Sequence, residues 1–306
     1  MLLKNYCSLF LILSVFSFAN CQKAGSGRNY RINGTMTVDG RTRTYLLNLP
    51  PVYYDSSGFS LVIGLHGLGG SAAQFERDYK FSDKANASGF IAVYPEGVQS
   101  NGILHLRTWN AGSCCDFAME NNIDDVKFIS QLIDQLLATY KINPKRVYVT
   151  GMSNGGMLAY RLACEIPGKI AAIGVNSCTM VVTQPCNPSR PMPILHIHSA
   201  IDTKVPPAGS FGMDGYYFPP VDSVLHVWSF INTCGGPPVS TIESGGYTFT
   251  KWAPCSNSYT IEYYLTGDGG HAWPGGLQSG PRGDTPSTEL NADDLIWAFF
   301  QRYELP

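Results

Sequence analysis

The chain has 306 residues, a formal net charge of −2 and 14% charged residues, so it carries no basic stripe that would favour nucleic acid as a partner. This length allows one large α/β domain or two small ones. Aromatic residues make up 12% of the chain, which also holds 32 glycines and 20 prolines, and this composition indicates a loop-rich globular protein with aromatic surface.

The first residues have the features of an export signal. Lys4 supplies the positive start, and the apolar run at 9–19 is too short to span a bilayer. Small residues in Ser17-Phe18-Ala19 predict cleavage by signal peptidase, with a mature chain starting near Asn20.

A second interpretation of the same region stays open. Phe18-Ala19-Asn20-Cys21 resembles a bacterial lipobox, which would make Cys21 a lipid anchor, although Asn20 departs from the usual small residue before that cysteine. In either case we expect a signal at 1–21 and a single domain at 22–306. The expected location is extracellular or at the cell surface.

Strand-like and helix-like segments alternate along the rest of the chain. Short apolar or alternating runs predict strands at 42–49, 61–65, 91–94, 147–150, 170–175, 194–197 and 259–265. Apolar residues at helical spacing predict helices at 124–140, 157–164, 221–231 and 292–303. The first strand alternates polar and apolar residues, so we expect it at an edge. The alternation as a whole indicates an α/β fold with a mostly parallel central sheet and helices on both faces.

One segment, 205–220, does not follow this alternation of strand-like and helix-like patterns. It is rich in glycine and proline and carries Phe211, Tyr216, Tyr217 and Phe218. It is either a long surface loop or a lid or rim of a substrate cleft. In the second case Tyr216 and Tyr217 are candidate substrate contacts.

The most informative segment is Val147-Tyr148-Val149-Thr150-Gly151-Met152-Ser153-Asn154-Gly155. A β-branched run leads into Gly-x-Ser-x-Gly, and a helical pattern follows. This context predicts a nucleophile elbow, in which a sharp strand-to-helix turn exposes the hydroxyl of Ser153. The flanking glycines fit a turn that is too tight for side chains.

A serine hydroxyl needs a general base and an orienting carboxylate to act as a nucleophile near neutral pH. The chain order Ser, acid, His predicts His271, which lies in a glycine-rich loop after a strand, and Asp202, which follows the strand at 194–197. Asp202 could instead cap its own turn. We expect His226 to pack in its helix and His66 to fix the shape of the glycine-rich loop behind it.

A serine that attacks a carbonyl through a tetrahedral intermediate also needs backbone N–H groups that bind the oxyanion. The predicted donors are the amides of Asn154 and Leu68. This chemistry requires no cofactor and no metal. A metal pair at His196 and His198 is an alternative, because residues i and i+2 of a strand share a face, but no further ligands are suggested by spacing.

Nine cysteines agree with an oxidising compartment. The expected loop disulfides are Cys178–Cys186 and Cys234–Cys255, and one member of the vicinal pair Cys114-Cys115 could reach Cys164. The connectivity itself stays open.

An ordered set of motifs resembles the polyhydroxybutyrate-depolymerase-like esterases, which include feruloyl and acetyl xylan esterases of carbohydrate esterase family 1. The set comprises Leu65-His66-Gly67, Tyr94-Pro95-Glu96-Gly97, Thr108-Trp109-Asn110-Ala111-Gly112, Cys114-Cys115, Asp124-Asp125-Val126, Gly151-Met152-Ser153-Asn154-Gly155-Gly156-Met157 and Gly270-His271-Ala272-Trp273-Pro274-Gly275.

This resemblance implies an α/β-hydrolase fold with Ser153, Asp202 and His271 as the catalytic triad. It also makes Trp109 and Trp273 candidate substrate contacts, with core packing as the alternative for Trp109. One departure is the acid loop, which usually reads His-Gly-Thr-x-Asp in the family. Here it lacks the glycine and reads His198-Ser199-Ala200-Ile201-Asp202.

The leading functional hypothesis is a secreted serine carboxylesterase that releases feruloyl groups from plant cell-wall xylan. Acetyl xylan esterase and polyhydroxybutyrate depolymerase are alternatives with the same triad. A metallohydrolase and a non-catalytic carbohydrate-binding protein are the alternatives from other classes.

Overall fold

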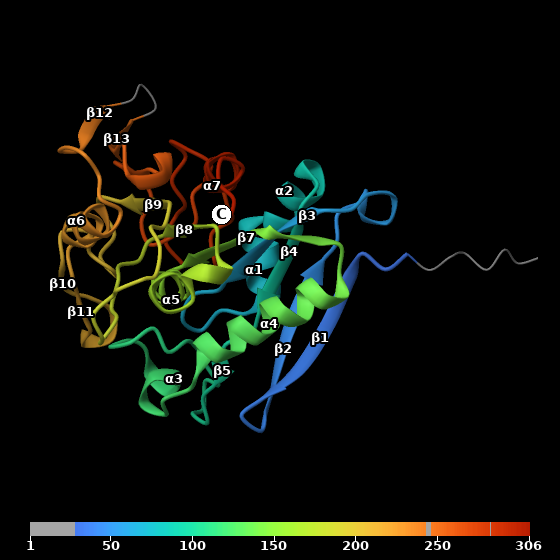
Figure 1. Ribbon diagram of the computed structural model, residues 1–306. Helices are drawn as coiled ribbons and strands as arrows, with labels where there is room; N and C mark the ends of the chain where they lie inside the picture. Colours follow the sequence, from blue (N-terminus) through green and yellow to red (C-terminus); the bar gives the residue numbers. More distant parts are fainter. Residues whose placement is uncertain (1–27, 243–245, 282) are drawn as a thin grey trace, which may run out of the picture.

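The computed structural model describes residues 28–242, 246–281 and 283–306. The signal at 1–21 and the lipid-anchor candidate Cys21 lie outside these residues. Ten strands form one sheet in the order β1-β2-β4-β3-β7-β8-β9-β14-β13-β12 (Figure 1). Their bounds are β1 Arg31–Val38, β2 Arg41–Asn48, β3 Phe59–Leu65, β4 Ile91–Pro95, β7 Ile142–Met152, β8 Ala172–Asn176, β9 Ile194–Ser199, β12 Val239–Ile242, β13 Tyr247–Trp252 and β14 Ile261–Thr266.

The centre of the sheet is parallel and its two sides are antiparallel. Strands β4, β3, β7, β8, β9 and β14 pair in parallel in that order, whereas β1, β2, β12 and β13 join through antiparallel ladders. Every residue of β3, β4 and β8 is buried, as expected for strands that are covered on both faces.

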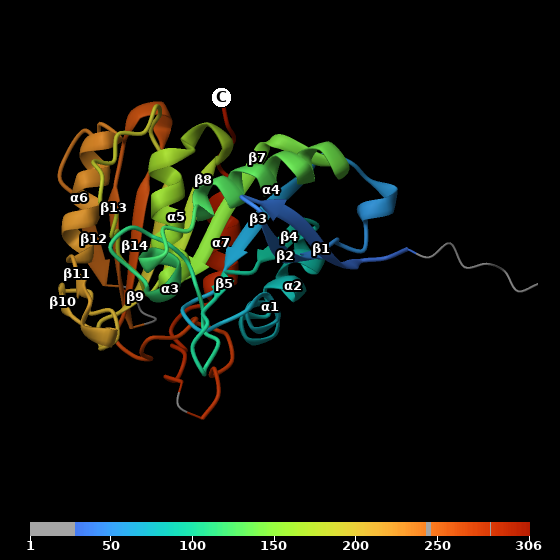
Figure 2. The ribbon, with the colours of Figure 1, turned by 90° about the horizontal axis from the view of Figure 1, so that it is seen from below.

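Helices cover both faces of the sheet. Helices α4, α5 and α6 lie on one face, and α1, α2 and α7 lie on the other (Figures 1 and 2). The helices are α1 Ala72–Tyr79, α2 Phe81–Ser88, α3 Asp116–Glu120, α4 Asp125–Thr139, α5 Asn154–Glu165, α6 Val221–Ile231 and α7 Ala292–Phe300. Short 3-10 helices are η1 Tyr53–Asp55, η2 Pro167–Lys169, η3 Met213–Gly215 and η4 Ser256–Ser258.

Two small hairpins complete the described structure. One pairs β5 Val98–Gln99 with β6 Arg107–Thr108, and the other pairs β10 Ser210–Phe211 with β11 Tyr217–Phe218. The irregular segment predicted at 205–220 therefore contains this second hairpin together with η3.

The predicted strands and helices are confirmed with shifted ends, the largest shift being at β7, which begins at Ile142 instead of residue 147. The α/β class is confirmed. The edge assignment of 42–49 is wrong, because β1 pairs along its whole length with β2 and β2 also pairs with β4. Strand β1 escaped prediction because seven of its eight residues are exposed or half-buried, so it shows no apolar run.

The disulfides differ in part from the expected pairs. Cys234–Cys255 is confirmed, but Cys164 pairs with Cys186, and the vicinal Cys114 and Cys115 pair with each other. Cys178 is a buried free thiol. It packs against α5, where a Cβ on Gly156 would lie 2.6 Å from its sulfur.

Within the described residues, none of the helices combines the length and the apolar character needed to cross a membrane.

Candidate active site

The segment around Ser153 forms the strand-to-helix turn that the sequence predicts. Ser153 joins β7 to α5 with φ 55° and ψ −124°, a conformation that is rare for a residue with a side chain. A Cβ on Gly151 would lie 2.5 Å from the Gly155 carbonyl carbon, and one on Gly155 would lie 2.2 Å from the Leu65 oxygen. Both flanking glycines are therefore required by close backbone contacts.

Asp202 and His271 come together although they lie on different loops. The Nδ1 atom of His271 is 2.8 Å from Oδ2 of Asp202. The other carboxylate oxygen accepts hydrogen bonds from the backbone N–H groups of Lys204 and Val205, each at 2.9 Å. Asp202 thus caps its own turn and orients the imidazole at the same time.

The surroundings of Asp202 keep it ionised. Burial alone would raise the pKa of this carboxyl, but hydrogen bonds from His198 and His271 outweigh burial and hold the pKa well below its usual range. The carboxylate is therefore charged across the neutral range.

The acid loop keeps its turn without the glycine that is usual in the family. Ser199 is buried in its place, and its hydroxyl donates to the Asp268 carbonyl at 2.9 Å and accepts from the Ile201 N–H at 3.2 Å. The serine therefore ties the acid loop to the start of the histidine loop.

A buried line of polar side chains lies behind the acid. The hydroxyl of Tyr160 is 2.8 Å from Nδ1 of His196, and Nε2 of His196 is 3.1 Å from Nδ1 of His198. The Nε2 atom of His198 is 2.8 Å from the Val205 carbonyl and 3.2 Å from Oδ2 of Asp202. A proton on Nε2 of both rings satisfies every contact.

This line bears on the metal-pair alternative. The nitrogens of His196 and His198 that would bind a metal are already engaged in hydrogen bonds, and burial lowers the pKa of His196 well below its usual value. Among the described residues, no three His, Cys, Asp or Glu side chains lie close enough to hold a metal ion together.

Contacts from three directions hold the histidine loop. Oδ2 of Asp284 accepts from the backbone N–H of His271 at 2.8 Å, and Nδ2 of Asn176 donates to the Ala272 carbonyl at 2.8 Å. The indole of Trp273 donates to Oδ1 of Asp293 at 2.8 Å.

Trp273 was expected to be a candidate substrate contact, and this expectation is wrong. Its side chain is 1% exposed and stacks on Tyr79, with ring centroids 4.8 Å apart. Phe75 and Phe81 meet it edge to face. The residue packs the histidine loop against α1 and α7.

The prediction of a substrate contact from Trp109 is also wrong, and the packing alternative holds. Trp109 is fully buried, and its indole N–H donates to the His66 carbonyl at 2.9 Å. The side chain of Asn154 bonds both the N–H and the carbonyl of Trp109, at 2.7 and 3.0 Å. Trp109 thus joins the glycine-rich loop to the start of α5.

Burial lowers the pKa of His66 to about 4, so its ring is neutral. This neutral ring fixes the same glycine-rich loop. Its Nδ1–H donates to the Gly67 carbonyl at 2.7 Å, and its Nε2 accepts from the Gly97 N–H at 3.0 Å.

Asn154 is the first residue of α5, so its backbone N–H has no partner within the helix.

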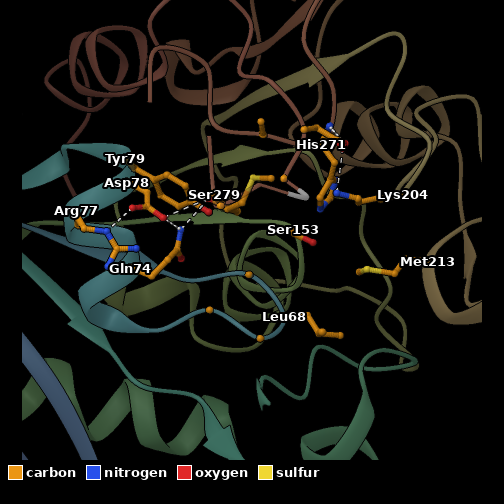
Figure 3. A pocket seen from close by; sticks show the side chains of 18 residues that line it. Leu68, Gln74, Arg77, Asp78, Tyr79, Ser153, Lys204, Met213, His271 and Ser279 are labelled. Carbon is orange, nitrogen blue, oxygen red and sulfur yellow. Dashed lines mark hydrogen bonds and ion pairs between the residues drawn. The ribbon is translucent and has the colours of Figure 1, made fainter. Parts of the chain in front are cut away.

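Ser153 and His271 open into one pocket of about 530 Å³ (Figure 3). Met213 is the residue of segment 205–220 that lines it, whereas Tyr216 and Tyr217 do not. The hydroxyl of Tyr216 accepts from the Asp116 N–H at 3.0 Å, and Tyr217 is 55% exposed, with its ring edge to face against Phe211. Tyr217 therefore stays a candidate contact only for a part of the substrate that extends beyond the pocket.

Several residues that line this pocket were not predicted from the sequence. Gln74, Arg77 and Asp78 come from α1, and Ser279 comes from the loop after His271. Because Gln74 and Ser279 are separated by 205 positions, no local pattern could have paired them.

The sheet order, the helices on both faces and the strand-to-helix turn at Ser153 define an α/β-hydrolase fold. Among solved structures, an acetyl xylan esterase from Aspergillus awamori shares this fold, with a TM-score of 0.62 at 15% identity over 88% of this chain and 99% of that one.

A family model described as esterase PHB depolymerase matches residues 43–207, and the chain belongs to this esterase family. Feruloyl esterase C of Emericella nidulans is 27% identical over 88% of this chain and 86% of its own length. Feruloyl esterase B of Piromyces equi is 26% identical over 75% of this chain, but the match spans only 42% of that protein.

Proposed function

We propose that the chain is a serine carboxylesterase in which Ser153, His271 and Asp202 form the catalytic triad. The observation that carries this proposal is the 2.8 Å contact of His271 with Asp202 at the pocket into which Ser153 opens. His271 takes the serine proton as Oγ attacks the ester carbonyl, and it then protonates the leaving alcohol. Water hydrolyses the resulting acyl-enzyme by the same route.

The backbone N–H groups of Leu68 and Asn154 bind the oxyanion of each tetrahedral intermediate. The free N–H at the start of α5 supports the assignment of Asn154. His66 and Trp109 hold the glycine-rich loop in place, and this supports the assignment of the Leu68 N–H as the second donor.

The substrate that we propose is a hydroxycinnamoyl ester of plant cell-wall xylan, from which the enzyme releases ferulate. Two relatives that carry the name feruloyl esterase support this choice. A pocket of about 530 Å³ also lies within the range that encloses ligands larger than an acetyl group.

The test is a panel of methyl ferulate, acetylated xylan, polyhydroxybutyrate film and p-nitrophenyl acetate, each assayed with the wild type and with Ser153→Ala. We expect ferulate release and p-nitrophenyl acetate hydrolysis, both abolished in the variant. Acetyl release or film clearing without ferulate release would move the assignment to the acetyl xylan or polyester alternative. Activity that survives Ser153→Ala would contradict the triad.

We further propose that the mature enzyme acts outside the cytoplasm. The disulfides Cys164–Cys186 and Cys234–Cys255 suit an oxidising compartment, and residues 1–21 have the pattern of a signal. Cell fractionation tests the location. Release of the Cys21→Ser variant from membranes into the medium, with the wild type retained, is the result expected if Cys21 carries a lipid.

A further inference from the structure

The pocket has two chemically different ends on opposite sides of Ser153. Figure 3 shows Gln74, Arg77, Asp78 and Ser279 gathered at one end, while Leu68 and Met213 lie across the serine from them. An ester bound at Ser153 therefore has one part near this polar cluster and the other near Leu68, Met213 and Lys204.

The polar end is organised around the carboxylate of Asp78. The side chain of Asp78 is 8% exposed and yet lines the pocket. Its Oδ1 accepts from Nε of Arg77 at 2.6 Å. Its Oδ2 accepts from Nε2 of Gln74 at 3.1 Å and from the Ser279 hydroxyl at 3.4 Å.

Two chain segments hold this arrangement in place. Gln74 and Asp78 are four residues apart on α1, so they share a face of the helix. Nε2 of Gln74 also donates to the Ser279 hydroxyl at 3.2 Å, and the Leu277 N–H donates to the Asp78 carbonyl at 2.7 Å. The helix and the loop that follows His271 thus form one wall before any substrate arrives.

We propose that this wall is a subsite for a hydroxyl group of the substrate, and this proposal rests on the function proposed above. A carboxylate only accepts hydrogen bonds, so it selects a ligand that donates one. The side chain of Arg77 is 67% exposed, and its terminal N–H groups can donate to the oxygen of the same hydroxyl. An acetyl group and an unsubstituted polyester repeat offer no such donor.

Two parts of a cell-wall ester carry this chemistry: the phenolic hydroxyl of the acyl group and a hydroxyl of the pentose. The phenol arm of the test compares methyl 4-hydroxycinnamate with methyl cinnamate and methyl 4-methoxycinnamate. The sugar arm compares arabinofuranosyl cinnamate with methyl cinnamate, because neither of them has a phenol. The arm in which wild-type kcat/KM rises identifies the source of the hydroxyl.

A hydrogen bond to a charged acceptor predicts a preference of about tenfold or more for the hydroxylated ester in one arm. We expect Asp78→Asn and Ser279→Ala to cut this preference to less than about threefold. The control is Ser57→Ala, which changes an exposed serine outside this pocket and should leave activity and preference unaltered.

Equal losses on hydroxylated and plain esters would show that Asp78 and Ser279 only support the loop, and would overturn the subsite. The absence of a preference in both arms, with p-nitrophenyl acetate still hydrolysed, would overturn it as well. A wild-type enzyme inactive on every ester would instead contradict the proposed esterase chemistry.

Discussion

Replacing Asp293 by asparagine should stabilise the protein at neutral and higher pH. Asp293 is 7% exposed at the start of α7, and its Oδ1 accepts from the Trp273 indole. Burial, followed by the nearby charges of Asp294 and Asp83, raises its pKa from 3.8 to about 7, against the opposing effects of Trp273 and Lys84. The amide keeps the acceptor oxygen and cannot ionise.

The pKa shift sets the sign and the size of the effect. Because the folded-state pKa lies above the unfolded value, the protonated carboxyl contributes stability below pH 3.8, and this contribution is lost as the pH rises through about 7. At about 1.4 kcal/mol for each tenfold change in proton affinity, the full loss is about 4 kcal/mol. The N-terminal end of α7 favours the ionised form by about 1 kcal/mol, which leaves a net cost of about 3 kcal/mol.

Urea denaturation at pH 4 and pH 8 measures this difference. We expect Asp293→Asn to exceed the wild type by about 3 kcal/mol in free energy of unfolding at pH 8, and to match it within about 1 kcal/mol at pH 4. The exposed neighbour provides the control. Asp294→Asn removes a surface ion pair with Lys84 and a charge that contributes less than burial to the Asp293 pKa, so it should change stability by less than about 1 kcal/mol. Equal stabilities at pH 8, or a gap that does not depend on pH, would refute this reasoning.

Three further changes test the supports of the site. Asp284→Ala removes the acceptor for the His271 N–H and should lower kcat about tenfold with little change in KM. Asp284→Asn keeps an acceptor oxygen and should retain most activity. Equal kcat values for the two variants would contradict this positioning role. Trp109→Phe removes the indole donor to the glycine-rich loop and should cost about 1–3 kcal/mol in urea unfolding together with a fall in kcat, and a stable variant with full activity would refute it. Replacing Cys164 and Cys186 by serine opens a loop of 22 residues and should lower the unfolding free energy by about 3 kcal/mol, which a thermal or urea melt at matched pH will confirm or exclude.

The central strands and the residues of the proposed triad could be picked out because their signals are local or ordered along the chain. β-Branched runs mark β3 and β7, and Gly-x-Ser-x-Gly marks the turn at Ser153 whatever the tertiary context. The order of serine, acid and histidine then leaves few candidates for Asp202 and His271.

The parts that escaped prediction depend on long-range packing. Trp109 and Trp273 belong to family motifs, but only the three-dimensional structure shows that both rings are buried. Cys164 lies near the end of α5, and its disulfide partner depends on where the loop that carries Cys186 passes this end. The polar wall of the pocket joins a helix and a loop that are distant in sequence, so hydrophobic periodicity cannot reveal it.

The position of the proposed triad in the sheet has a consequence for the order in which the enzyme unfolds. Ser153, Asp202 and His271 follow β7, β9 and β14, which lie in the middle of the ten-stranded order, while β1 and β12 form the exposed margins. Fraying that starts at either margin must cross at least one further strand before it reaches a catalytic loop. Deuterium uptake during mild heating should therefore begin in β1 and β12 while turnover is still intact.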